Sequence, residues 1–112
     1  MDIQERGIAA ARAFLDRIGF EVLLGDIAVV RGIDILSIDG NIFVATLVRV
    51  RQRPAEVAPV SGRTLDAALR NIIDHRKSYA PQCDAVRVDV ISILVLSEGR
   101  ALLRHYRGER SG

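Results

Sequence analysis

A two-residue turn signal, Asp39-Gly40, separates two apolar runs and constrains the fold of this chain more than any other feature. The sequence ILSI precedes it and NIFV follows it. Both turn positions tolerate a positive φ, so Asp-Gly between two such runs is a strong hairpin signal. We therefore predict two strands, over residues 27–38 and 42–51, joined by this turn.

Two helices and three further strands are predicted around this hairpin. Apolar residues recur at helical spacing over residues 3–18 and about 64–79. Gly19 is expected to end the first helix, and Ser61 or Thr64 to cap the second. The further strands are expected over residues 20–24, 86–96 and 101–106. The predicted fold class is α/β, with a mixed sheet flanked by two helices in the order α-β-β-β-α-β-β.

The length of 112 residues allows one hydrophobic core, so residues 1–112 are predicted to form a single domain with a frayed tail over about 108–112. No apolar run reaches the roughly 20 residues that span a bilayer, and the N-terminal segment lacks the pattern of a signal peptide. The single cysteine, Cys83, rules out an internal disulfide framework. These features predict a cytoplasmic location and no membrane partner.

The positive charge is carried almost entirely by arginine, because Lys77 is the only lysine. The net charge is only +2, which does not by itself imply nucleic-acid binding. Arginine binds phosphate well because its planar fork donates two hydrogen bonds at once; arginine in place of lysine is also typical of GC-rich genomes. Arg49, Arg51 and Arg53 alternate and would share one face of an extended strand. They are interpreted either as a phosphate-contacting stripe or as a solvated strand end.

Several segments are similar, in order and spacing, to motifs of one nuclease family. They are GIAAARAFL from Gly7, Gly19-Phe20, GIDIL from Gly32, Asp39-Gly40, VRVDV from Val86, and Leu103-Arg104-His105. On these residues the chain resembles the YraN-like family, which belongs to the restriction-endonuclease-like PD-(D/E)XK class. The resemblance implies a single endonuclease-like domain, with DNA as a possible partner.

The resemblance also implies that most of the active site is missing. In such nucleases an Asp and a Glu hold a divalent metal, and a Lys beside the Glu helps to position the attacking water. Aligned from the hairpin, the family's Glu-Val-Lys falls on Leu47-Val48-Arg49, and two further family glutamates fall on Ile8 and Gly32. Asp34 alone is unchanged, and Arg49 keeps the charge of the lysine.

We therefore predict no catalytic residue, with Asp34 and Arg49 vestigial. No cofactor is expected; Mg or Mn, with Asp34 among its ligands, would bind only if carboxylates elsewhere restored the site. The candidates for such relocated carboxylates are Glu5, Asp66 and Asp74. Ile8 and Leu47 are expected to close the former cleft by packing.

Asp34 lies in an otherwise apolar strand, and Arg49 is its predicted neighbour across the hairpin. We predict a buried salt bridge between them in preference to a metal site. His75, His105 and Cys83 show no zinc spacing and are interpreted as surface or core residues.

Three functions remain open at this point. The leading hypothesis is a catalytically degenerate nuclease-fold protein that binds nucleic acid or serves as an assembly module, with Arg49, Arg51 and Arg53 on the phosphates. The second is a metal-dependent DNA endonuclease with relocated carboxylates. The third is a protein-interaction or structural domain, such as a homodimer, without nucleic-acid contact.

Overall fold

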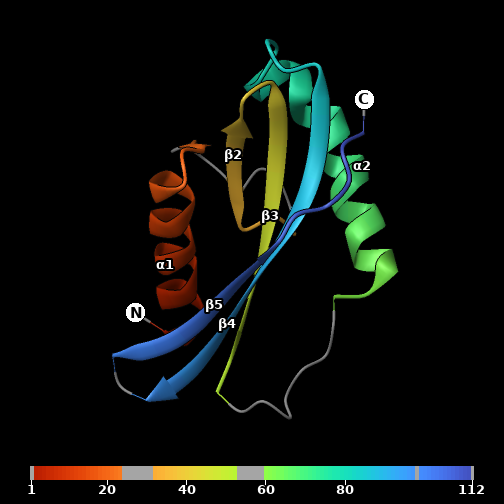
Figure 1. The fold of residues 1–112 in the computed structure, drawn as a ribbon. Coiled ribbons are helices and arrows are strands. Elements are labelled where there is room, and N and C mark those ends of the chain that lie inside the picture. The colour runs from red at the N-terminus through yellow and green to blue at the C-terminus, as the bar shows by residue number, and fades with distance from the viewer. Residues whose placement is uncertain (1, 24–31, 53–59, 98, 112) are drawn as a thin grey trace.

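The computed structural model describes residues 2–23, 32–52, 60–97 and 99–111, which form an α/β fold (Figure 1). The elements are α1 (Ile3–Arg17), β1 (Glu21–Val22), β2 (Ile35–Asp39), β3 (Ile42–Arg51), α2 (Gly62–Tyr79), β4 (Ala85–Ser97) and β5 (Arg100–Tyr106). The described strands form one mixed sheet in the order β1-β2-β3-β4-β5. The predicted order of helices and strands is confirmed. Neither helix is long and apolar enough to cross a membrane.

The hairpin of β2 and β3 turns where the sequence predicts it. Asp39 pairs with Ile42 across the turn, and Gly40 has a φ of +63°, a conformation that glycine adopts without steric cost. β3 and β4 are parallel and are connected through α2, whereas every other neighbouring pair in the described sheet is antiparallel. This parallel pair places the C-terminal half of β3 beside the middle of β4.

Capping residues set the starts of both helices. The Asp2 side chain accepts a hydrogen bond from the Glu5 backbone N–H (2.7 Å) at the start of α1. Ser61 accepts one from the Thr64 backbone N–H (3.2 Å) at the start of α2, so Ser61 is the N-cap. Each side chain satisfies a backbone donor that has no partner within the helix.

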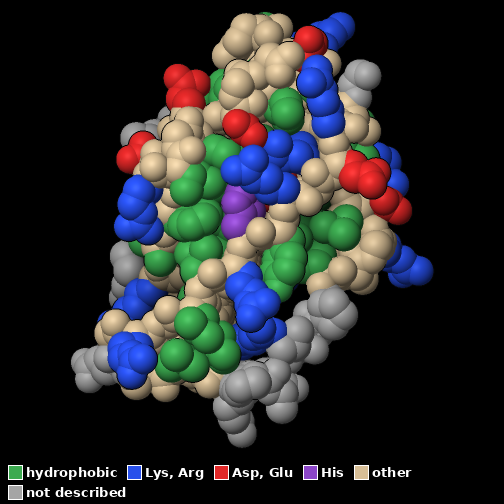
Figure 2. All heavy atoms as spheres, viewed as in Figure 1, with side chains coloured by type: hydrophobic (Ala, Val, Ile, Leu, Met, Phe, Trp, Pro, Cys, Tyr) green, Lys and Arg blue, Asp and Glu red, His purple; other side chains and the backbone are tan. Residues whose placement is uncertain are grey.

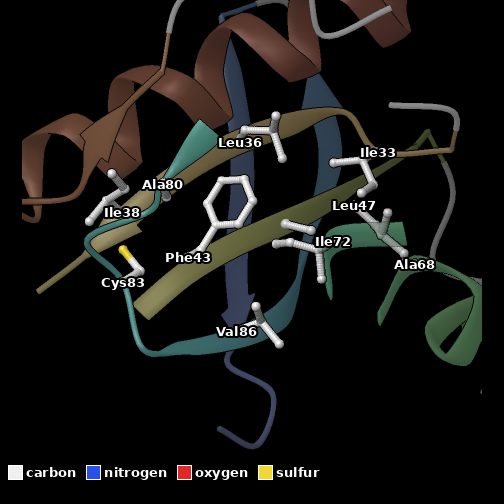
Figure 3. Close-up of a cluster of buried hydrophobic side chains, with 11 residues drawn as sticks. Ile33, Leu36, Ile38, Phe43, Leu47, Ala68, Ile72, Ala80, Cys83 and Val86 are labelled. Atoms are coloured by element: carbon white, nitrogen blue, oxygen red, sulfur yellow. The ribbon is translucent and has the colours of Figure 1, made fainter. Parts of the chain in front are cut away.

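The two helices cover opposite faces of the sheet and enclose two separate apolar cores. On the α1 face, Ala11 and Leu15 pack with strand residues that include Val48 and Ile93. On the α2 face, Ala68 and Ile72 pack around Phe43 and Leu47 of β3 (Figure 3). Because successive strand residues point to opposite faces, each β3 side chain belongs to one core only.

Several predicted boundaries differ from the structure; the strand predicted over residues 20–24, for example, is Glu21–Val22. The strand predicted over residues 27–38 begins at Ile35 in the structure: residues 32–34 are described but form a turn and bend, and residues 24–31 lie outside the described part of the chain. The expectation of a frayed tail is wrong for residues 108–111. The backbone N–H of Gly108 donates to Asp89 (3.1 Å), and Ser111 exchanges two backbone hydrogen bonds with Val86. The tail therefore continues along the free edge of β4 beyond β5.

Candidate functional site

Asp34 immediately precedes β2, and its side chain bonds to the backbone of β3. Its Oδ2 accepts a hydrogen bond from the Val48 N–H at 2.7 Å. The described residues of β2 pair with β3 only as far as Thr46, so Val48 has no backbone partner there. The Val48 carbonyl is satisfied in the same way, by side-chain donors from Gln4 (3.0 Å) and Arg49 (3.2 Å). The Asp34 carboxylate therefore replaces the backbone acceptor that a longer β2 would offer to Val48.

Asp34 and Arg49 form an ion pair, as predicted, but the pair is long and is not buried. The closest approach, from Nη1 of Arg49 to Oδ2 of Asp34, is 3.9 Å, and the Arg49 side chain is 46% exposed. The Asp34 side chain is 24% exposed. Water therefore reaches both charges. The short hydrogen bond of Asp34 is the one to the backbone N–H of Val48. Arg49 keeps its hydrogen bond to the Val48 carbonyl, and nearly half of its side chain is exposed to an outside anion.

Leu47 lies where the resemblance would place a metal-binding glutamate, and it is fully buried against Ala68 and Ile72 of α2. Ile8 packs instead into the core under α1. The expectation that Leu47 and Ile8 close one cleft together is wrong, since they belong to cores on opposite faces of the sheet. Gly32 is exposed and has a φ of +82°.

The candidate relocated carboxylates are not brought together. Glu5 is exposed on α1, and Asp66 and Asp74 are exposed on α2. These helices lie on opposite faces of the sheet. Within the described ranges, no three His, Cys, Asp or Glu side chains are placed so that they could hold a metal ion.

Arginines of β3 and β5 lie opposite shared neighbours on β4, on the face of the sheet against which α2 packs. Arg49 is directly opposite Ser92 of β4, which is opposite Arg104 of β5. The adjacent row runs from Arg51 through Leu94 to Leu102. These six residues, which we call the arginine rows, include three arginines and no carboxylate. Arg53, the third member of the predicted stripe, lies outside the described residues.

The arginine rows are open to solvent to different degrees. Arg49 and Arg104 are exposed, whereas Arg51 is half-buried and its Nε has no hydrogen-bond partner among the described residues. In Figure 2, blue basic side chains lie next to green hydrophobic ones over the lower part of the molecule, where β4 ends and β5 begins. The surface thus combines cationic and apolar groups.

A second polar site lies on the opposite face, around the fully buried carboxylate of Asp89. It accepts hydrogen bonds from Nε of Arg87 (2.7 Å) and Nη2 of Arg87 (3.0 Å), and from the backbone N–H of Gly108 (3.1 Å). Nε2 of His105 lies 2.8 Å from Oδ2 of Asp89. Arg87 also donates to Asp39 at 3.0 Å. These partners replace the hydration that the Asp89 carboxylate loses on burial.

Aromatic rings enclose this buried cluster. The rings of Phe14 and Phe20 meet the His105 ring edge to face, with centroids 5.7 and 5.8 Å away. The Arg87 guanidinium lies 5.6 Å from the Phe20 ring centroid. Burial alone would lower the pKa of Arg87, but the hydrogen bonds and charges of Asp89 and Asp39 raise it above its ordinary value. Arg87 therefore stays charged, and the cluster anchors β5 and the tail to β4.

The sequence contains signals for this cluster that the site prediction did not use. Arg87, Asp89 and His105 lie in the segments VRVDV and LRH, which the resemblance includes. Arg87 and Asp89 are two residues apart in a strand and so point to the same face. A charged pair at that spacing in an apolar strand indicates a buried ion pair. The contact with His105 follows only once β4 and β5 are paired.

His75 and Cys83 are structural residues. Nδ1 of His75 lies 2.7 Å from the Asn71 carbonyl, within α2. Cys83 is buried in the core under α2. Desolvation by this burial raises the pKa of its thiol, outweighing the opposing charge of Arg76.

A comparison of the chain with protein-family models gives no match, and a comparison with curated proteins gives none either.

Proposed function

We propose that this chain is a nucleic-acid-binding module with a restriction-endonuclease-like fold and a degenerate nuclease site. The proposal depends on one observation, the arginine rows on the open part of the sheet. Arg49 and Arg104 flank Ser92, and Arg51 lies one row further along. Three guanidinium groups in two adjacent rows favour a polyanion, because each can donate paired hydrogen bonds to phosphate, and the nearby Asp34 carboxylate offsets the charge of Arg49 alone.

The state of the former nuclease position supports binding without chemistry. Leu47 is buried in the core and Asp34 is bonded to Val48. Leu47 carries no atom that can bind a metal ion, and Oδ2 of Asp34 already accepts a hydrogen bond from Val48. Phosphate contacts by themselves position a nucleic acid without selecting its sequence. We therefore expect weak, sequence-tolerant binding that falls steeply with salt.

The test measures the salt dependence of binding. Fluorescence anisotropy with labelled single-stranded, duplex and branched DNA and with RNA, started at ~50 mM salt, gives the slope of log K against log salt. The double variant R51Q with R104Q should weaken binding to all sequences alike and reduce that slope by about two. Glutamine keeps part of each side-chain stem, so thermal unfolding should change little.

The matched control is R6Q with R17Q, which removes the same charge from exposed positions on α1. It should leave the slope nearly unchanged. Equal effects of the two double variants would show that net charge, and not the arginine rows, drives binding. Absence of binding by the wild type to every probe would refute the proposal.

The exposed leucines favour a second candidate function, a protein-interaction domain. Leu96 and Leu102, at the end of the β4–β5 hairpin, are each about half exposed. Exposed apolar groups of this size often mark interaction sites. Sedimentation velocity separates a homodimer from a monomer, and L102S should shift a dimer toward monomer.

A further inference from the structure

We infer that the nucleic acid bound on the arginine rows is single-stranded and that Tyr106 stacks on one of its bases. The inference rests on the proposed function and names the form of nucleic acid that this surface fits. It depends on the placement and exposure of one aromatic ring relative to Arg104.

Tyr106 lies on the same face as the arginine rows. It is directly opposite Val90 of β4, and Val90 is opposite Leu47 of β3. Leu47 and Val90 pack in the core under α2, which fixes the face to which this third row points. His105, the preceding residue, points the other way, toward Phe14 under α1.

The Tyr106 ring is available to a ligand. It is 53% exposed, and it stacks on no other ring within the described part of the chain. The other described aromatic rings are already in contact with one another or with His105: Phe14, Phe20, Phe43 and Tyr79. The low aromatic content of the sequence therefore does not exclude base stacking, because the single ring on this surface is an exposed one.

The alternation along β5 distinguishes a single strand from a duplex. Leu102, Arg104 and Tyr106 share one face and present an apolar, a cationic and an aromatic side chain in turn. Leu102 is 52% exposed. A duplex offers phosphates to a sheet surface but keeps its bases stacked inside, so it would satisfy the arginines alone. A single strand offers both phosphates and unstacked bases. Only a single strand can therefore place a base against the exposed side chains of Leu102 and Tyr106.

The test compares an oligothymidylate of about 12 nucleotides, a length within the usual range of single-strand sites, with the duplex that it forms with oligoadenylate. Binding is followed by anisotropy and by quenching of tyrosine emission from the unlabelled protein. The chain has no tryptophan and two tyrosines, of which Tyr79 contacts Phe43 in the core. The emission change therefore reports chiefly on Tyr106.

We expect the single strand to bind more tightly than the duplex at the same salt. Y106A should weaken single-strand binding about tenfold and abolish most of the quenching, while the duplex affinity and the salt slope stay nearly unchanged. Y106F keeps the ring and should keep the affinity. I18A, which truncates an exposed apolar residue at the end of α1, is the matched control and should have no effect.

The outcomes separate this inference from the proposed function. Equal or tighter binding of the duplex, or single-strand binding that Y106A leaves unchanged, overturns the single-strand inference while the proposed function stands. Failure of both probes to bind overturns the proposed function and the inference with it. Loss of duplex binding in Y106A, in parallel with loss of single-strand binding, shows a structural role for Tyr106 and also overturns the inference.

Discussion

Asp34 accepts a hydrogen bond from the Val48 N–H at 2.7 Å, whereas the nearest guanidinium nitrogen, Nη1 of Arg49, is 3.9 Å away. The carboxylate thus bonds to the edge of β3, where the described part of β2 gives no backbone partner. This hydrogen bond gives the partly buried carboxylate of Asp34 a partner next to the apolar strand β2. The Asp34 carboxylate therefore stabilises the open end of the β2–β3 hairpin.

The first prediction concerns the energy of that contact. D34A should lower the free energy of unfolding by about 1–2 kcal/mol, because the Val48 N–H loses a charged acceptor in a partly buried position. R49A should change it by less than about 1 kcal/mol, as expected for an ion pair open to water. Urea unfolding of both variants measures these values.

The double variant D34A with R49A completes a thermodynamic cycle. We expect a coupling energy below about 1 kcal/mol. A coupling of several kcal/mol would mean that the two side chains form a tight ion pair in solution, contrary to the distance described here.

The second prediction is that the purified protein does not cleave DNA in Mg²⁺ or Mn²⁺. L47E should not create cleavage either, and it should destabilise the fold strongly, because it places a carboxylate in the core beside Ala68 and Ile72. Supercoiled plasmid incubated with each metal detects nicking, and thermal unfolding detects the loss of stability. Metal-dependent nicking by the wild type that disappears in D34A would establish the relocated-carboxylate alternative.

The third prediction concerns Asp89. D89L leaves the buried Arg87 without its main partner and should destabilise by about 3–5 kcal/mol. Adding R87M should recover much of that loss, since two apolar residues of similar volume can replace a buried ion pair. Chemical denaturation of the single and double variants gives both values.

An exposed ion pair provides the comparison for Asp89. Asp84 and Arg110 are 3.1 Å apart at the surface, with both side chains more than half exposed. D84N should therefore cost less than about 1 kcal/mol. If D89L proved as mild as D84N, Arg87 would have to find water or another partner in the folded protein.

The sequence predicts the local features of this fold better than its sites. The Asp39-Gly40 turn and both helix patterns depend on neighbouring residues, and the structure confirms them. The alignment of Arg49 and Arg104 on either side of Ser92 depends on β4 lying between their strands, which no local pattern specifies. Burial also differs from the prediction. Arg49, which is predicted to be buried, is exposed, whereas Arg87, which is not predicted to be buried, is buried.

The last prediction concerns the close approach of α1 to the sheet. Gly7 is buried against Val50 of β3, and a methyl group added at this position would overlap Cγ2 of Val50. G7A should therefore destabilise by about 1–3 kcal/mol, the usual cost of overpacking, although alanine is the better helix former. G62A is the matched control: it also lies in a helix, has open space around its Cβ position, and should leave stability unchanged or slightly raised. The double variant G7A with V50A removes the clashing methyl groups and should restore part of the loss. If G7A were as stable as G62A in thermal unfolding, α1 would lie further from β3 than described here, and the hydrogen bond from Gln4 to the Val48 carbonyl would be lost with it.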